Sequence, residues 1–135
     1  MAQRVEPFRL WPGTRAEVPL DGVGFVRVHL DSHEKPLPHQ TIRVLLPADA
    51  PLRFAQPALT VEASDREPQR YRASLSDDER AMTISDVDVT ADGSLCELVA
   101  ALAPTAAAQP GNSSHVTFVV GDAMSHTFAE IVSGD

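Results

Sequence analysis

Cysteine is almost absent from this chain of 135 residues, in which Cys96 stands alone. A single cysteine cannot form an intrachain disulfide, and a zinc site built from several cysteines is excluded. Cys96 lies in an apolar segment between Leu95 and Leu98, where we expect a buried and unreactive thiol. As a nucleophile it would need a nearby imidazole, and His115 and His126 are candidates only at a large distance in sequence.

Lysine is equally scarce, because Lys35 is the only one among eleven basic residues, which face nineteen acidic residues. The formal net charge of −8 works against binding to nucleic acid or to an anionic membrane surface. Both kinds of binding depend on cationic side chains that replace counterions at phosphates. The predominance of arginine over lysine is typical of a GC-rich genome.

Motifs of common enzymes are missing. The sequence has no Gly-x-Ser-x-Gly element and no glycine-rich phosphate loop, since Gly22 and Gly24 flank Val23 without a third glycine. It has no run of about 18 apolar residues that could span a membrane, and no apolar N-terminal segment of the signal-peptide type. We therefore expect no catalytic residues, no cofactor and no membrane span, with the location left open between the cell interior and export.

The chain does contain enough apolar material for a folded domain. Hydrophobic residues make up 43% of it and charged residues 22%, the proportions of a globular protein. A chain of this length can bury a substantial core as a single unit. No repeat, charged tail or linker divides it, so we expect one domain over residues 1–135, with its core in about residues 20–132.

Apolar and polar residues alternate in several short segments. In residues 24–31 every second residue is apolar, Val28 among them, and residues 41–46 repeat this pattern around Val44 before Pro47 ends it. Alternation with a period of two is typical of a half-buried antiparallel strand. Val28 and Val44 are therefore predicted to lie in the core.

The clearest single signal is a hairpin over residues 74–89. Residues 70–75 and 81–85 have the composition of two strands, and the charged segment 76–80 between them is a tight turn in which Asp caps backbone N–H groups. Strand candidates recur about every 8–15 residues along the rest of the chain. This density predicts an all-β fold, an antiparallel β-sandwich of about 7–9 strands with Greek-key connections.

Residues 94–103 fit two different templates. A capping-box pattern opens the segment at Ser94, and leucines recur in it at helical spacing. As a strand, alternate residues from Cys96 to Leu102 would form an apolar set facing the core. We favour the strand, because the strands predicted on both sides need a partner, and keep a short helix as the alternative.

The order of several motifs resembles a known family. Ile42-Arg-Val-Leu-Leu-Pro47 ends a strand in Leu-Pro, Leu52-Arg-Phe54 brings an aromatic residue to the next loop, and Pro110-Gly111 precedes a late strand. This order is similar to the immunoglobulin-like "conserved repeat" β-sandwich domains of bacterial cell-surface and exported proteins, actinobacterial ones included. The resemblance covers about residues 20–132. It implies an immunoglobulin-like sandwich displayed outside the cell or on its surface, with no catalytic residues to carry over.

Histidines and clustered carboxylates are the candidates for a metal site. His29, His33 and His39 would be the best set, but they lie on an exposed strand face and in a loop, so we interpret them as solvated surface imidazoles. Acidic residues near the hairpin could offer oxygens to Ca²⁺, which needs six to eight, but no EF-hand loop is present. These acidic residues are Asp77, Asp78, Glu79, Asp86, Asp88 and Asp92. We expect no bound metal.

Loop residues are the candidates for binding a partner. Trp11, followed by Pro12-Gly13 in a turn, is either a recognition side chain or a plug for the open end of the sandwich. Loops 11–16 and 32–39 carry the large or polar groups that are least constrained by core packing. The predicted binding residues are Trp11, Arg15, His33, Lys35 and His39.

These observations predict an interaction or adhesion module that binds a protein partner and performs no chemistry. The alternative is a carbohydrate-binding module in which Trp11 or Tyr71 stacks on a sugar ring, and a small enzyme or inhibitor on this scaffold is a third hypothesis. Exposed edge strands would allow a homodimer. The net charge of −8 favours a neutral or basic partner.

Overall fold

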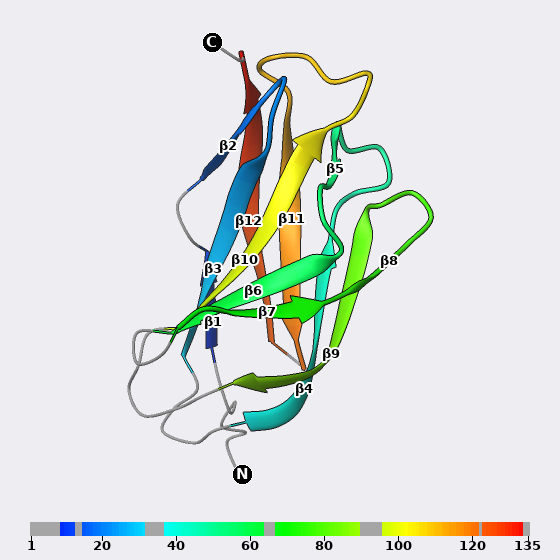
Figure 1. Ribbon diagram of the computed structural model, residues 1–135. Coiled ribbons are helices and arrows are strands. Elements are labelled where there is room, and N and C mark those ends of the chain that lie inside the picture. Colours follow the sequence, from blue (N-terminus) through cyan, green and yellow to red (C-terminus); the bar gives the residue numbers. More distant parts are fainter. Residues whose placement is uncertain are drawn as a thin grey trace, which may run out of the picture.

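The computed structural model describes residues 9–12, 15–31, 37–63, 67–89, 96–121 and 123–133. Within these segments all regular structure is β-strand, arranged in two sheets that pack face to face (Figure 1). Twelve strands are described, which is more than the predicted seven to nine. The all-β sandwich itself is confirmed.

Sheet A has six strands in the order β1-β3-β10-β6-β7, with β5 paired to the far end of β10. All its pairs are antiparallel. Its strands are β1 (Arg9–Pro12), β3 (Gly24–Asp31), β5 (Leu52–Phe54), β6 (Ala58–Ala63), β7 (Gln69–Arg72) and β10 (Cys96–Pro104).

Sheet B also has six strands, in the order β2-β12-β11-β4-β9-β8. Its strands are β2 (Ala16–Pro19), β4 (Leu37–Leu45), β8 (Ser74–Leu75), β9 (Ala81–Val89), β11 (Ser113–Val120) and β12 (Ala123–Val132). The pair of β2 with β12 is parallel, a departure from the purely antiparallel sandwich that the sequence predicts. Hairpins join β6 to β7, β8 to β9 and β11 to β12. The connection from β5 to β6 stays within sheet A, and the other connections cross between the sheets.

The core lies between the sheets and follows the predicted alternation. Val28 on β3 and Val44 on β4 are 0% exposed, which confirms that both are core residues. Leu52 and Phe54 on β5 are also fully buried, as their spacing predicts. Burying such apolar side chains provides most of the free energy that stabilises a sandwich of this size.

Strand β10 settles the ambiguity over residues 94–103 in favour of a strand. It lies between β3 and β6, so its backbone groups pair on both sides. Its outward residues Val99, Ala101 and Ala103 are only 6–7% exposed, nearly as buried as the inward set. Because both faces of β10 are largely covered, all its residues except Glu97 are apolar, and this weakens the alternation that distinguishes a strand from a helix.

The extra strands arise where the chain changes sheets within a predicted strand or continues as a strand into a predicted turn or loop. The predicted strand 70–75 is two strands, because the chain changes sheets at Ala73, whose N–H donates to the carbonyl of Pro57. Trp11 and Pro12 form part of β1 instead of a turn, and residues 37–39 belong to β4 instead of a loop. The sequence also indicates a first strand around residues 5–10, of which residues 5–8 lie outside the described residues.

Candidate functional site

The predicted binding residues fall in different parts of the fold. Trp11 lies on β1, opposite His29 of β3 in the strand register. Arg15 precedes β2 and forms an ion pair with Glu130 of β12 at one side of sheet B. His39 lies on β4 in the same sheet, while His33 and Lys35 lie outside the described residues.

His39 sits in an irregular part of the β4–β9 pair. Its Nδ1 lies 3.0 Å from Oδ1 of Asp86, and both residues have positive φ angles, 58° and 60°. The register between the strands shifts on both sides of Gln40, as in a β-bulge. Both side chains are about four-fifths exposed, at 78% and 80%, so this pair is open to solvent. The structure therefore does not gather Trp11, Arg15 and His39 on one surface.

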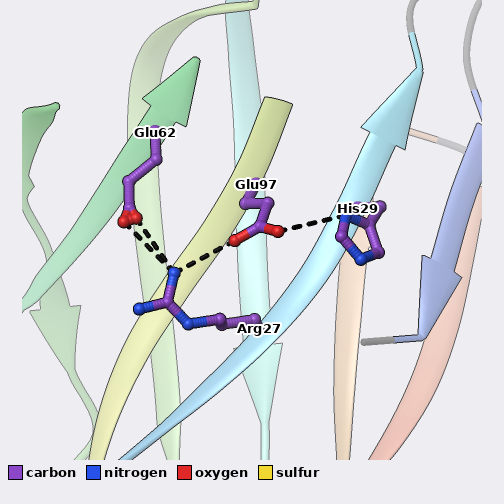
Figure 2. A network of polar contacts seen from close by, with 4 residues as sticks. All are labelled: Arg27, His29, Glu62 and Glu97. Carbon is purple, nitrogen blue, oxygen red and sulfur yellow. Dashed lines mark hydrogen bonds and ion pairs between the residues drawn. The ribbon is translucent and has the colours of Figure 1, made fainter. Parts of the chain in front are cut away.

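A different group of side chains does converge, on the outer face of sheet A. Figure 2 shows Arg27 of β3 reaching across β10, where its Nη1 meets both carboxylate oxygens of Glu62 on β6, at 2.9 and 3.1 Å. The same Nη1 lies 3.0 Å from Oε2 of Glu97 on β10. Oε1 of Glu97 in turn lies 3.3 Å from Nδ1 of His29. We call Arg27, His29, Glu62 and Glu97 the charged network.

The strand register places the charged network together. Glu97 pairs with His29 on one side and with Glu62 on the other, so the three side chains form a row across three strands. Val99 pairs with Arg27, whose guanidinium crosses β10 to reach Glu62 on β6. The hydrogen bonds from Arg27 to Glu62, and next those to Glu97, raise the pKa of Arg27 above its ordinary value.

His29 is the least satisfied member of the charged network. Its Nδ1 is shielded from solvent and makes no hydrogen bond within the described residues, although Glu97 is near. Glu62 and Glu97 both accept hydrogen bonds from the guanidinium of Arg27. The charged network thus joins three neighbouring strands of sheet A through their side chains.

A hollow of about 460 Å³ lies at the end of sheet A where the β2–β3 turn meets β5 and β10. We call it the apolar hollow after its aliphatic lining residues, which share the surface with the charged Asp21 and Arg53. Its lining residues are Leu20, Asp21, Gly22, Val23, Arg53, Ala55, Ala103 and Pro104. Phe25 on β3 pairs with Ala101 on β10, two residues along each strand from Val23 and Ala103. Phe25 is 56% exposed and Val23 is 43% exposed. Phe25 thus lies beside the apolar hollow, on a surface that combines aliphatic groups with the charged Asp21 and Arg53.

The β2–β3 turn that holds one wall of the apolar hollow is tightly fixed. The N–H of Leu20 donates to the carbonyl of Val132 at 2.9 Å. At Gly24 a Cβ atom would lie 2.4 Å from the carbonyl oxygen of Glu17, so β2 and β3 approach too closely for any side chain there. This wall of the hollow is therefore held in place by the backbone.

Three further observations concern metal ligands, membrane-spanning helices and Tyr71 in the described residues. No three side chains of His, Cys, Asp or Glu among them are grouped to hold a metal ion. No helix in these segments has the length and hydropathy needed to cross a membrane. Tyr71, a candidate aromatic for sugar stacking, is only partly exposed and packs against the core.

The sequence identifies Phe25 as an exposed residue, but it identifies neither the apolar hollow nor the charged network as a whole. The alternation in residues 24–31 places Phe25, Arg27 and His29 on the outer face of their strand, and the structure agrees. Glu62 and Glu97 went unnoticed, because their meeting depends on a register between strands that are 35 residues apart in sequence. In the alternative in which residues 94–103 form a helix, Glu97 would belong to the capping box.

Comparison with known proteins bears on the fold. No family model matches the sequence, and no curated protein matches it. The collagen-binding domain of a Staphylococcus aureus adhesin matches with a TM-score of 0.53 and 5% identity, over 95% of this chain and 99% of that one. The major pilin subunit of Bacillus cereus matches with a TM-score of 0.58 and 10% identity, over 95% of this chain.

A C-terminal fragment of the major pilin of Streptococcus agalactiae also matches, with a TM-score of 0.54 and 11% identity over 94% of this chain. The chain spans 41% of the Bacillus subunit and 55% of the Streptococcus fragment. At such low identity these likenesses concern the fold alone. They confirm the immunoglobulin-like sandwich of bacterial surface proteins that the resemblance in sequence predicts.

Proposed function

We propose that this chain is a non-catalytic adhesion module, displayed outside the cell or on its surface, that binds a protein partner. The observation that carries the proposal is the exposed Phe25 beside the apolar hollow. Large exposed apolar groups next to a preformed concavity are typical of protein interaction sites. The fold shared with surface adhesins and pilins supports a location at the cell surface.

The geometry favours a protein over a sugar as the partner. Leu20, Val23 and Ala103 offer aliphatic contacts to the ligand, whereas sugar recognition relies on an exposed aromatic platform with convergent hydrogen-bonding groups. Asp21 and Arg53 stand at the rim, where charged groups orient a ligand without being buried. Arg53 also holds Glu79, at 3.2 Å, and is thereby fixed in place.

Collagen is the first ligand to test, because the staphylococcal domain that this chain resembles along its full length is a collagen-binding domain. Surface plasmon resonance on immobilised fibrillar collagen, together with a panel of other extracellular matrix proteins, would measure binding by the wild-type chain. We expect saturable binding to at least one protein. Phe25→Ser should then weaken it about tenfold, as expected for loss of a central apolar anchor.

The matched control is Phe128→Ser. Phe128 lies on β12 in the outer face of sheet B and is 46% exposed, so it resembles Phe25 in size and exposure but not in place. This variant should bind like the wild type. Failure of every protein ligand combined with a positive glycan array would establish the carbohydrate-binding alternative in place of our proposal.

The loop residues predicted from sequence form a second arm of the same experiment. A combined His33, Lys35 and His39 alanine variant and an Arg15→Ala variant would be measured beside Trp11→Ala. If the loops contribute, these variants weaken binding while the melting temperature stays nearly unchanged. A fall in stability of about 3 kcal/mol or more for Trp11→Ala would identify Trp11 as a core residue instead.

A further inference from the structure

Strand β7 is the last strand of sheet A and is paired on one side only. Its four residues pair antiparallel with β6, from Ala58↔Arg72 to Val61↔Gln69. No described strand pairs with its other side. The open side of such an edge strand presents unpaired backbone N–H and C=O groups, which can accept a further strand.

The strand is firmly held, so its open edge is a fixed template. Tyr71 packs partly against the core, and its hydroxyl donates to the side-chain oxygen of Gln69 at 3.0 Å. Directly after the strand, the N–H of Ala73 donates to the carbonyl of Pro57 at 2.8 Å. An edge that is already ordered loses little conformational entropy when it pairs.

Two arginines give this edge a positive charge. Arg70 and Arg72 are two residues apart on β7 and share its outward face, where they line a hollow of about 330 Å³ with Pro57 and Ala58. Arg70 donates to the side-chain oxygen of Gln56 at 3.0 Å. Neither guanidinium forms an ion pair within the described segments.

Most other described arginines are engaged by the protein itself. Arg15, Arg27 and Arg53 form ion pairs with glutamates, and Arg80 donates to the carbonyl of Ala50. On a chain with a net charge of −8, two adjacent uncompensated guanidinium groups are a local exception. They repel a second basic edge, which prevents edge-to-edge pairing with another copy of this chain, and they attract carboxylates.

We propose that the β7 edge binds an extended, acidic peptide segment of a partner protein, which pairs with β7 as a further strand. Backbone hydrogen bonds to the open edge would provide affinity, and carboxylates placed two residues apart on the segment would meet Arg70 and Arg72. The spacing of two matches because alternate residues of a strand face the same side. This site is separate from the apolar hollow and does not depend on it.

The experiment uses a fluorescein-labelled octapeptide in which Glu alternates with Val, and measures its binding to the whole chain by fluorescence anisotropy. The comparison peptide carries Lys in place of Glu. We expect the acidic peptide to bind, more weakly at high salt, and the Lys peptide not to bind. The double variant Arg70→Gln/Arg72→Gln should bind the acidic peptide about tenfold more weakly, in line with the loss of two exposed ion pairs.

Arg43→Gln is the matched control, because Arg43 is an exposed arginine on β4 of sheet B with no ion pair among the described residues. It should leave the affinity unchanged. Equal binding by the double variant and the wild type would overturn the proposal. If the double variant does not fold, as judged by circular dichroism, equal binding of the Glu and Lys peptides to the wild type would overturn it instead.

Backbone pairing has its own readout. Hydrogen exchange of the amides of residues 69–72 should slow when the acidic peptide binds, and a peptide N-methylated at alternate residues should lose affinity. Binding that depends on Arg70 and Arg72 but leaves these amides unprotected would overturn strand pairing. A sulfated oligosaccharide that binds the same arginines without protecting the amides would likewise replace the acidic segment as the ligand.

Discussion

The outer faces of the two sheets cover the same core but are built from different interactions. On sheet A the charged network ties three strands together through Arg27. On sheet B the rings of His115 and Phe128 lie 4.2 Å apart between β11 and β12, and Thr117 Oγ1 lies 2.8 Å from Nδ1 of His126. The described ion pairs of sheet B lie away from this ring contact, at Arg15–Glu130 and His39–Asp86.

The difference follows from what lies beneath each face. Apart from Glu97, the outward positions of the central strand β10 in sheet A carry the small residues Val99, Ala101 and Ala103. They leave room for a long side chain such as Arg27 to reach a partner two strands away. On sheet B the central pair carries rings and Thr117, which meet their direct and diagonal neighbours. The predictions below test how far each face contributes to stability.

The largest loss of stability is expected from substitutions on the inner faces of the two sheets. The loss should be about the same for both sheets. Val28→Asp in sheet A and Val44→Asp in sheet B each place a charge at a position that is 0% exposed. Each should cost about 4 kcal/mol or more, since no partner compensates the buried carboxylate. Urea unfolding would measure it. A folded variant of either kind with an unchanged midpoint would contradict the strand register.

These inner faces are also the part of the fold that the sequence predicted best. Alternation specifies the inward side of each strand locally, and the turn chemistry of Ser76 and Asp78 marks the β8–β9 hairpin. Pairing between strands that are distant in sequence leaves no such local mark. The parallel β2–β12 pair, the sheet change at Ala73 and the meeting of Glu62 with Glu97 therefore had to come from the structure.

The candidate site, too, can be predicted from the sequence only in part. Exposure of Phe25 follows from alternation alone, but the apolar hollow beside it joins the β2–β3 turn, β5 and the end of β10, which are far apart in sequence. The loop residues selected for their chemistry lie in separate places, because chemical type says nothing about spatial convergence. On a sandwich, the exposed residues of each strand can thus be predicted from the sequence, but their convergence with residues of other strands cannot.

Substitutions on the outer faces of the two sheets should cost less stability, and the cost should differ between the sheets. Arg27→Ala removes the centre of the charged network and should cost about 1 kcal/mol, given that the Arg27 side chain is 44% exposed and solvent screens its charge. Arg43→Ala on sheet B should cost close to nothing. Thermal unfolding at low and high salt would measure both, and only the cost of Arg27→Ala should shrink with salt. Equal costs would mean that the charged network contributes no stability.

In the turn between β8 and β9, the charge of Asp78 should stabilise a single hairpin. Asp78 Oδ1 accepts from the Ser76 hydroxyl at 2.6 Å and from the N–H of Arg80 at 3.2 Å. These hydrogen bonds, that of Ser76 first, lower the pKa of Asp78 below its ordinary 3.8. A lowered folded-state pKa means that the stabilisation is present above pH 3.8 and is lost as the pH falls through the folded-state value.

Asp78→Asn should therefore lower the melting temperature at pH 7, and the difference from the wild type should vanish near pH 2. Asp77→Asn is the control, since the neighbouring Asp77 side chain makes no hydrogen bond in the described turn, and its melting curve should follow the wild type at both pH values. Differential scanning calorimetry from pH 7 to pH 2 would measure both. A constant difference for Asp78→Asn over that range would assign the effect to shape instead of charge.

The smallest expected effect is that of chelators, which should leave the melting temperature unchanged. On sheet B, His115 and His126 lie with ring centroids 6.2 Å apart, and on sheet A, Glu97 is the one potential metal ligand near His29 among the described side chains. Two side chains leave most coordination positions of a transition metal to water, so neither face offers a closed site. A fall of about 5 °C with excess chelator would reveal a bound ion worth about 1 kcal/mol. Comparing His115→Ala/His126→Ala with His29→Ala would then show which face holds it, because only the variant that lacks the ligands should become insensitive to the chelator.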